Sequence, residues 1–404
     1  MDEAGKDIGS QEHVNFRQPI IVNIETEAPS GRSEIIKLSE RTVGQPIPLI
    51  MEKEIDPPSH NKHDFISISP YWYQLEDGGY EIRDGVKNPE ADSIPDAGNL
   101  DRVTSNIYIM SLATEASSSP EDKQRFTRYA LDNLRTWFVD ADTRMNPDLN
   151  YAQVKQGGET GSFWGIIEGV RLVKVTEAVA KLEASGAISD ADREVVDKTR
   201  EWFRKYLQWL LTDEKAIGKP DAGNDRERGG ERGMDNNHGT FYDVQVACIA
   251  DFVGDGEQAK ATLESTRHRI DQQIEVSGQM PAETRRKNEG SKKDLDVSLD
   301  YELFNLQGLV QLAMLGEKYG VDLWGHQSPG RGGIRKAFEY FAAKLRNIEG
   351  NPFKFDRKGA MYVAFRAAAQ EYGIDEYWNL PTKIYHDPLA EEVTSKLFQK
   401  PNQN

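Results

Sequence analysis

The side chains with the clearest chemical potential are Asn236, Asn237 and His238, which stand next to one another in the sequence. Apolar residues recur at helical spacing directly after them, so the three polar groups precede a predicted helix. A helix N-terminus carries partial positive charge and unpaired N–H groups, and it therefore suits an anion such as a carboxylate. The structural alternative is that Asn237 or Thr240 simply caps the helix.

Aromatic residues gather in a second stretch, where Tyr71 and Trp72 lie among prolines and glycines. We interpret this stretch as a loop. Aromatic rings on a loop can stack on sugars, and Arg83 and Lys87 add positive charge for an acidic ligand. The same rings can instead pin the N-terminal region to the body of the protein, because buried aromatics also dominate packing.

Two later segments place further polar groups near predicted helices. An amide-rich run ends at Gln153, and a basic run containing Arg285 and Arg286 follows Pro281. Tyr301 lies at the start of a strongly apolar helix. Taken alone, such a tyrosine is typical of a protein core, so a chemical role for it depends on the motifs around it.

The chain has 404 residues, a formal net charge of −17 and 37% hydrophobic residues. The charge argues against nucleic acid and anionic membrane surfaces as partners, and no apolar stretch reaches the length of a membrane span. Cys248 is the sole cysteine, and its apolar neighbours indicate a buried hydrophobe rather than a nucleophile. The seven histidines lack the spacing of a helical zinc pair, so no catalytic metal or other cofactor is expected.

Helical periodicity begins at about residue 97 and continues to about residue 372. We predict nine helices, whose apolar positions span residues 100–112, 126–138, 166–182, 195–211, 240–252, 259–274, 299–315, 334–348 and 361–372. No internal repeat is visible, which argues against a regular solenoid. A toroid of antiparallel helix pairs fits the pattern, with the loops at one end building a cleft.

The remaining organisation is less regular. We interpret residues 1–60 as an extended N-terminal arm with little regular helix and with short β-like pieces at 19–24 and 47–50, and residues 61–404 as one helical domain. Long polar loops interrupt the helices at 213–235 and 285–296. Such loops are either mobile lids over the cleft or solvated surface segments, and the sequence leaves both possibilities open.

Taken together, these segments resemble the alginate lyase fold family. The resemblance is strongest to polysaccharide lyase family 38, with family 5 a more distant relative. The matching segments lie between about residues 65 and 320, at 69–72, 83–89, 144–153, 236–245, 281–286 and 300–305. The resemblance implies an all-α fold, an incomplete α/α toroid of antiparallel helix hairpins, and cleavage of a 1,4-linked uronate polymer such as alginate or glucuronan by β-elimination.

The catalytic residues of that family match four positions in this sequence. Asn237, His238 and Arg286 are expected to neutralise the uronate carboxylate, and Tyr301 to act as base and acid, with His238 sharing the base role as an alternative. The expected substrate-binding residues are Gln153, Asn236, Tyr71, Trp72, Arg83, Trp164 and Arg285. One departure is the insertion at 287–296, which separates Arg286 from Tyr301 more widely than in the family. Arg285 or a lysine is therefore the alternative to Arg286.

An acidic polysaccharide is the expected partner of a monomeric enzyme that is secreted or periplasmic. The first residues carry no secretory signal pattern, which leaves a cytosolic start or a mature secreted chain open. Two other classes of function also stay open. A glycoside hydrolase needs two carboxylates beside the scissile bond, for which Asp243 and Glu283 are candidates. A non-catalytic carbohydrate-binding protein is the third. Only elimination leaves an unsaturated uronate that absorbs ultraviolet light.

Overall fold

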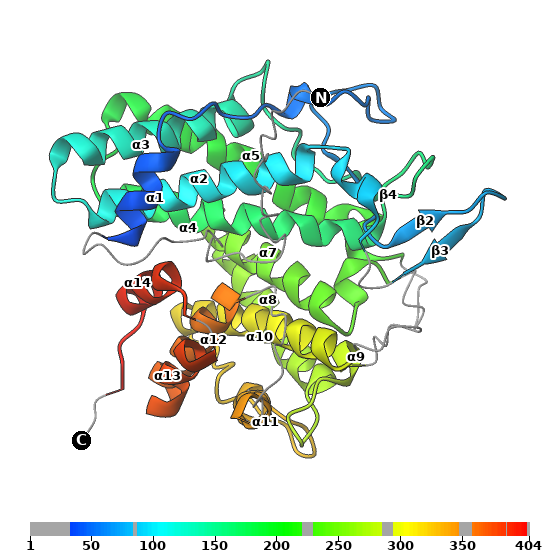
Figure 1. Cartoon of the computed structure of the whole chain (residues 1–404), viewed down its shortest axis with the longest axis vertical. Coiled ribbons are helices and arrows are strands. Elements are labelled where there is room, and N and C mark those ends of the chain that lie inside the picture. Colours follow the sequence, from blue (N-terminus) through cyan, green and yellow to red (C-terminus); the bar gives the residue numbers. More distant parts are fainter. Residues whose placement is uncertain are drawn as a thin grey trace, which may run out of the picture.

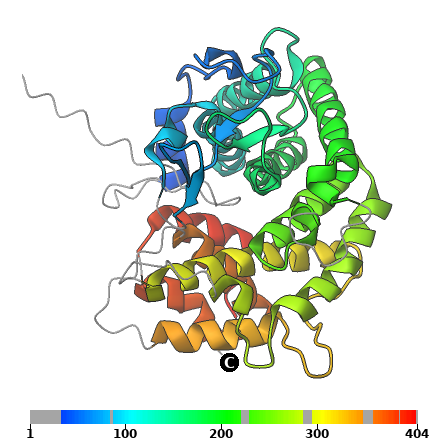
Figure 2. The same cartoon turned by 90° about the vertical axis from the view of Figure 1, so that its right-hand side faces the viewer.

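The computed structural model describes residues 33–83, 87–219, 229–284, 294–346, 358–384 and 386–401. Helices dominate this part of the chain, and the strands are few and short. In Figure 2 the helices follow a broad arc, from the blue and cyan N-terminal elements through the green ones to the orange and red C-terminal elements. The prediction of an all-α, toroid-like fold is therefore confirmed.

The elements of the fold are as follows. The longer helices are α1 (Glu34–Thr42), α2 (Asp96–Ala116), α3 (Pro120–Leu134), α4 (Val170–Ala184), α5 (Arg193–Thr212), α7 (Asn237–Val253), α8 (Gly256–Gln273), α10 (Asp294–Lys318), α11 (Ile334–Arg346), α12 (Lys358–Tyr372), α13 (Asp375–Ile384) and α14 (Pro388–Leu397). The connections contain the short helices α6 (Glu214–Ile217) and α9 (Pro281–Thr284) and the 3₁₀ segments η1 (Ile50–Glu52), η4 (Phe163–Gly169) and η6 (Glu231–Gly233). The strands are β1 (Ile66–Ile68), β2 (Trp72–Gln74), β3 (Tyr80–Ile82) and β4 (Tyr151–Val154).

Two rows of helices build the arc. In the first row α2, α4, α7, α10 and α12 each contact the next helix in this order. In the second row α3, α5, α8, α11 and α13 pack against members of the first. Helix α7 is buried on nearly all sides, whereas α5 and α11 bury one face and expose the other. This difference follows from composition, because a helix covered on both sides must be apolar all round.

Close packing between α7 and α10 fixes the central part of the first row. The rings of Phe241 and Phe304 stack with their centroids 4.1 Å apart. Gly308 lies directly below α7, where an added Cβ would come within 2.8 Å of the Thr240 methyl group. A larger residue would push the two helices apart, so glycine here sets both their distance and their register.

The two ends of the described chain meet at α1 and α14, which lie near each other in Figure 1. The Glu392 carboxylate of α14 accepts hydrogen bonds from the backbone N–H groups of Glu34 and Ile35 at 2.6 and 3.2 Å, and from the hydroxyl of Ser33. These are unpaired donors at the start of α1 that an anion stabilises. A carboxylate about 360 residues away in the sequence thus caps the first described helix.

The nine predicted helices correspond to observed helices, but several other predictions were wrong. Helix α1 lies in the region that we expected to be extended. Residues 47–49 form no strand, and Ile50 begins η1 instead. The aromatic stretch is not simply a loop, because β2 and β3 form an antiparallel hairpin and β1 pairs in parallel with β4. Helices α13 and α14 were not predicted. Residues 19–24 lie outside the described part.

Candidate active site

The first turn of α7 carries the Asn-Asn-His block. Asn236 is the N-cap, and its side-chain oxygen accepts the His238 backbone N–H at 3.0 Å. The structural alternative, capping by Asn237 or Thr240, is therefore not what the structure has, because Asn236 is the cap. The Thr240 hydroxyl instead lies 3.1 Å from the Gln273 side-chain oxygen. Asn236 is 4% exposed and serves as the cap, and its expected contact with the substrate stays a prediction.

Glu283 of α9 holds Asn237 in place. Its fully buried carboxylate accepts the Asn237 backbone N–H at 2.5 Å and the side-chain Nδ2–H at 2.7 Å. Hydrogen bonds to an ionised acceptor are stronger than neutral ones. The pair of bonds orients the Asn237 amide, so its position does not depend on a ligand.

Glu231 of η6 holds His238 in a similar way. The Nδ1 atom of His238 lies 2.8 Å from the Glu231 carboxylate, which is fully buried, while the His238 side chain is 12% exposed. A carboxylate partner places a proton on Nδ1 and leaves Nε2 as the acceptor of the neutral ring. It also stabilises the ring when the ring is protonated. Trp164 of η4 contacts the His238 ring edge-on, with centroids 5.8 Å apart.

Sequence reasoning missed Glu231. This residue lies in a segment rich in glycine and charged residues, where nothing distinguishes it from Glu227. It precedes His238 by seven residues, but the intervening chain is not one continuous helix, so helical spacing gave no signal. Only the fold shows that the two side chains meet.

Tyr301 lies in the second turn of α10 and is 2% exposed. Its hydroxyl oxygen is 3.4 Å from that of Tyr71, which precedes β2. The two residues are 230 positions apart in the sequence. The stacked rings and close approach of α7 and α10 hold this part of α10 beside the helix that carries Asn237 and His238.

Gln153 lies within β4. Its backbone φ is 49°, a left-handed conformation that is uncommon for residues other than glycine. The Gln153 N–H donates to the Ser67 hydroxyl at 2.8 Å, and its side chain is hydrogen-bonded to Glu168. Burial raises the pKa of the Glu168 carboxyl, and the Gln153 and Ser67 hydrogen bonds oppose that rise.

Glycine allows η4 to lie close against β4. A Cβ at Gly165 would come within 2.5 Å of the Ala152 carbonyl oxygen, so no larger residue fits there. The neighbouring Trp164 packs on Phe163 with ring centroids 4.0 Å apart and reaches His238. The β4–η4 segment therefore supplies two predicted site residues, Gln153 and Trp164.

Trp72 and Arg83, which we expected to bind substrate, contact other residues of the hairpin or Lys155. The Lys155 ammonium lies 3.7 Å from the ring centroid of Trp72, and Arg83 pairs with Glu81 at 2.7 Å. Arg83 also lies over the Tyr73 ring. In the described part of the chain, no contact joins Trp72 or Arg83 to the residues of α7. Their role in substrate binding stays a prediction.

Arg285, Arg286 and residues 287–293 of the insertion lie outside the described residues, so their expected roles also stay predictions. The last residues of the insertion, 294–296, are not loop but the start of α10. Both carboxylates considered for a hydrolase are already engaged. Asp243 is ion-paired with Arg269 at 2.6 Å, and Glu283 binds Asn237. With exposures of 3% and 0%, they support neighbouring groups and are not placed as a pair beside a bond to be hydrolysed.

Two further findings concern groups outside this region. Burial raises the pKa of the Cys248 thiol to about 12, which agrees with the predicted inert role. None of the described helices is both long and apolar enough to cross a bilayer.

Comparison with known proteins identifies the family. The family model for alginate lyase matches residues 49–352. The chain belongs to the alginate lyase family. It is accordingly a polysaccharide lyase, and the hydrolase alternative is wrong. Among curated proteins, none matches the sequence significantly.

Solved structures show the same fold. A crystal structure of an alginate lyase from Bacteroides ovatus is 24% identical and has a TM-score of 0.73, covering 89% of this chain and 90% of its own. Alginate lyase A1-III, as a histidine-to-alanine variant complexed with a tetrasaccharide, is 16% identical with a TM-score of 0.53, covering 91% and 95% of the two chains. At these identities the likeness supports the toroid fold alone.

Proposed function

We propose that this lyase cleaves a 1,4-linked uronate polymer by β-elimination, with Asn237 and His238 binding the uronate carboxylate and Tyr301 transferring the proton. The observation that carries the proposal is the pair of buried carboxylates, Glu283 and Glu231, that orient these two donors in advance. Preorganised donors stabilise charge as it develops, because they need no rearrangement during the reaction.

The chemistry requires three events at the sugar. A base removes the C5 proton, electrons move into a C4–C5 double bond, and the C4–O4 bond breaks while the leaving oxygen gains a proton. Charge builds up on the carboxylate during this sequence, and hydrogen bonds from the Asn237 amide and from the Nε2–H of the protonated His238 ring would stabilise it. Tyr301 is suited to both proton transfers, since its hydroxyl can donate and accept. His238 is the alternative base, because Glu231 would stabilise its protonated ring.

The charge of the remaining site residues fits an acidic substrate. Arg286, or Arg285 in its place, would add a cation near Tyr301 and favour its ionised form. Gln153, Trp164 and Tyr71 would contact the sugar from the other side, because they belong to segments that touch His238 or Tyr301. Trp72 and Arg83 would bind sugars further along the polymer.

Alginate is the substrate that we favour, with glucuronan second. Alginate lyase A1-III binds a tetrasaccharide as histidine-to-alanine and tyrosine-to-phenylalanine variants, which are the two residue types that we assign here. We further propose membership of polysaccharide lyase family 38, action as a monomer, and a secreted or periplasmic location.

A panel of uronate polymers tests the proposal. Alginates rich in each of their two uronates, glucuronan and a neutral 1,4-linked glucan would be incubated with the enzyme, and both ultraviolet absorbance and new reducing ends measured. We expect both signals to rise together on at least one uronate and neither on the glucan. Reducing ends without absorbance would contradict elimination, and no cleavage of any uronate would contradict the substrate class.

A further inference from the structure

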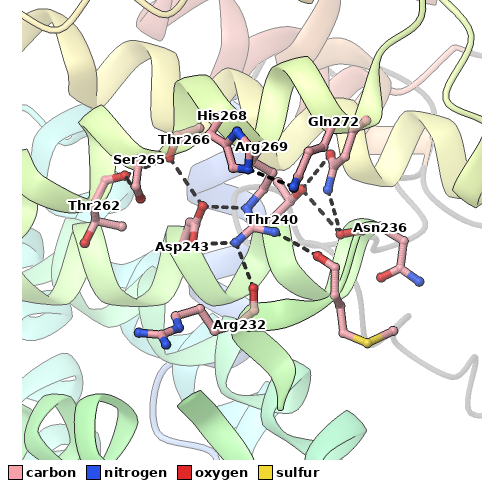
Figure 3. A network of polar contacts seen from close by, with 12 residues as sticks. Arg232, Asn236, Thr240, Asp243, Thr262, Ser265, Thr266, His268, Arg269 and Gln272 are labelled. Carbon is pink, nitrogen blue, oxygen red and sulfur yellow. Dashed lines mark hydrogen bonds and ion pairs between the residues drawn. The ribbon is translucent and has the colours of Figure 1, made fainter. Parts of the chain in front are cut away.

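A second layer of contacts lies behind the first turn of α7, on the side of α8. The Arg269 guanidinium donates to both carboxylate oxygens of Asp243, at 2.6 and 3.0 Å. Its other N–H groups donate to the backbone carbonyls of Met234 at 2.8 Å and Arg232 at 3.1 Å. Figure 3 shows this group, which we call the Arg269 clasp: Arg269, Asp243 and the two carbonyls.

The clasp holds the segment that connects Glu231 to the first turn of α7. Residues 232–235 run directly from Glu231, the partner of His238, to Asn236, the cap of α7. Both carbonyls that Arg269 binds belong to this short segment. The guanidinium has a rigid, planar set of donors, so it fixes the two carbonyls relative to Asp243 within α7 itself.

Glycine at position 239 makes the clasp possible. A Cβ at Gly239 would lie 2.1 Å from the Met234 carbonyl oxygen and 2.2 Å from the Arg269 Nη1 atom. The backbone φ of Gly239 does not require glycine, so the requirement is one of space. The first turn of α7 is thus shaped to let Arg269 reach the carbonyl.

Gln273, one turn further along α8, reinforces the same arrangement. Its side-chain N–H donates to the Asn236 carbonyl at 3.0 Å, while its oxygen accepts from Asn305 of α10 at 2.9 Å and from Thr240. Helix α8 therefore binds the segment before α7 at three carbonyls. A cavity of about 450 Å³ lies beside the clasp, but neither Asn237, His238 nor Tyr301 lines it.

We propose that Arg269 is a positioning residue for the lyase reaction, acting through the carbonyls of residues 232 and 234 to keep Glu231 against His238. This inference rests on the proposed roles of Asn237 and His238. The ion pair with Asp243 fixes the Arg269 guanidinium relative to α7. The two carbonyl contacts then fix residues 232–234, which directly follow Glu231, relative to the same helix. Loss of the clasp would leave the substrate-binding groups present but misaligned.

Two variants test the clasp from opposite sides. Arg269→Lys keeps the positive charge next to Asp243 but cannot bind both carbonyls, whereas Gly239→Ala keeps Arg269 and removes the space that it occupies. Displacement of a catalytic group by about 1 Å can cost about a hundredfold in rate. We expect both variants to lower kcat by about 10- to 100-fold with KM within about threefold of the native value.

Arg366→Lys is the matched control. Arg366 is also buried, at 4% exposed, and also binds a backbone carbonyl of another helix, that of Glu391 at 2.9 Å. It lies on α12, away from the candidate site, so this variant should lower the melting temperature and leave kcat unchanged. An equal loss of kcat in Arg366→Lys would show a global effect and overturn the proposal.

A spectroscopic measurement separates positioning from general stability. The ring nitrogens of 15N-histidine-labelled protein report the tautomer, and the His238 signal is assigned by its absence in His238→Gln. Native protein should show Nδ1 protonated. In folded Arg269→Lys and Gly239→Ala, judged by a cooperative melt, we expect a mixture of tautomers. If either folded variant keeps the native signal and native kcat, Arg269 has no positioning role.

Failure of the proposed function would look different. If Asn237→Ala and His238→Ala keep native activity on every uronate polymer that is cleaved, the assigned catalytic roles are wrong whatever Arg269 does. If those two variants lose activity while the clasp variants do not, only the positioning role of Arg269 is wrong.

Discussion

The hydrogen bonding of buried polar side chains differs between the first turn of α7 and the buried face of α10. Around α7, the carboxylates of Glu231, Glu283 and Asp243 each bind a donor at 2.8 Å or less. On α10, within the described part of the chain, neither the Gln307 amide nor the Glu302 carboxylate makes a side-chain hydrogen bond of normal geometry. Both residues are at most 1% exposed.

The contrast shows that, in comparison with α10, short hydrogen bonds between buried side chains are concentrated around the first turn of α7. Unpaired buried polar groups cost about 1–3 kcal/mol each, so the Gln307 amide and the Glu302 carboxylate place a penalty on α10. Paired carboxylates around α7 fix the donors that the reaction needs. Helix α10 contributes Tyr301, whose hydroxyl lies near that of Tyr71. The comparison therefore predicts that changes at α7 and at Tyr301 alter rate, while changes elsewhere on α10 alter stability.

The largest effect is expected for Tyr301→Phe. The substitution keeps the ring and removes the hydroxyl, so turnover should fall by about two to four orders of magnitude, the usual contribution of a positioned proton-transfer group. Stability should change by less than about 1.5 kcal/mol because the shape is conserved. Ultraviolet product formation and a thermal melt measure the two effects. Tyr71→Phe is the control, since it removes only the neighbouring hydroxyl. Full activity in Tyr301→Phe would show that Tyr301 only packs in the core and that His238 is the base.

The next effect is expected for Asn237→Ala and His238→Ala. Each removes one donor to the uronate carboxylate, which should lower kcat by about two to three orders of magnitude, as for loss of an oxyanion-hole donor. Both variants should fold, because neither side chain belongs to the apolar core. Steady-state kinetics on the best uronate polymer check the prediction. Near-native activity in the double variant would remove both residues from the mechanism.

A smaller effect is expected for Glu283→Gln. Asn237 donates two hydrogen bonds to Glu283, and a glutamine offers only one oxygen to accept them. One donor is left unpaired, which should cost about 1–3 kcal/mol of stability and lower kcat by about tenfold through misplacement of the Asn237 amide. Urea unfolding and kinetics measure the two losses. A variant that loses stability alone would show that Glu283 supports the fold and not the site.

The smallest effect on rate and a distinct effect on stability are expected for Glu302→Gln. Burial raises the pKa of the Glu302 carboxyl to about 7. The Met280 N–H lowers this pKa, whereas the nearby Glu283 carboxylate raises it further. Since the folded pKa lies above the unfolded one, the native state binds more protons between about pH 4.5 and 7. Glu302 therefore makes the native protein less stable as pH rises through this range.

Replacement by glutamine should remove that penalty. Glu302→Gln should be more stable than the native protein at pH 8, by at most about 3 kcal/mol, and show no such gain at pH 4. Denaturant unfolding at the two pH values measures the difference, with Glu257→Gln on the exposed face of α8 as the control. A loss of kcat comparable to that of Asn237→Ala would contradict the division between the two helices.

The sequence by itself determined the helical class, because apolar spacing at 3.6 residues marks the nine main helices from α2 to α12. It also determined that Asn237 and His238 stand at a helix N-terminus, because apolar residues at helical spacing begin directly after them. Tertiary structure decided the partners: Glu231 for His238, Glu283 for Asn237, and Arg269 for two backbone carbonyls. Periodicity tells which face of a helix is buried but not which residue lies opposite. Those pairings arise only when the two rows of helices pack and bring together side chains that the sequence keeps apart.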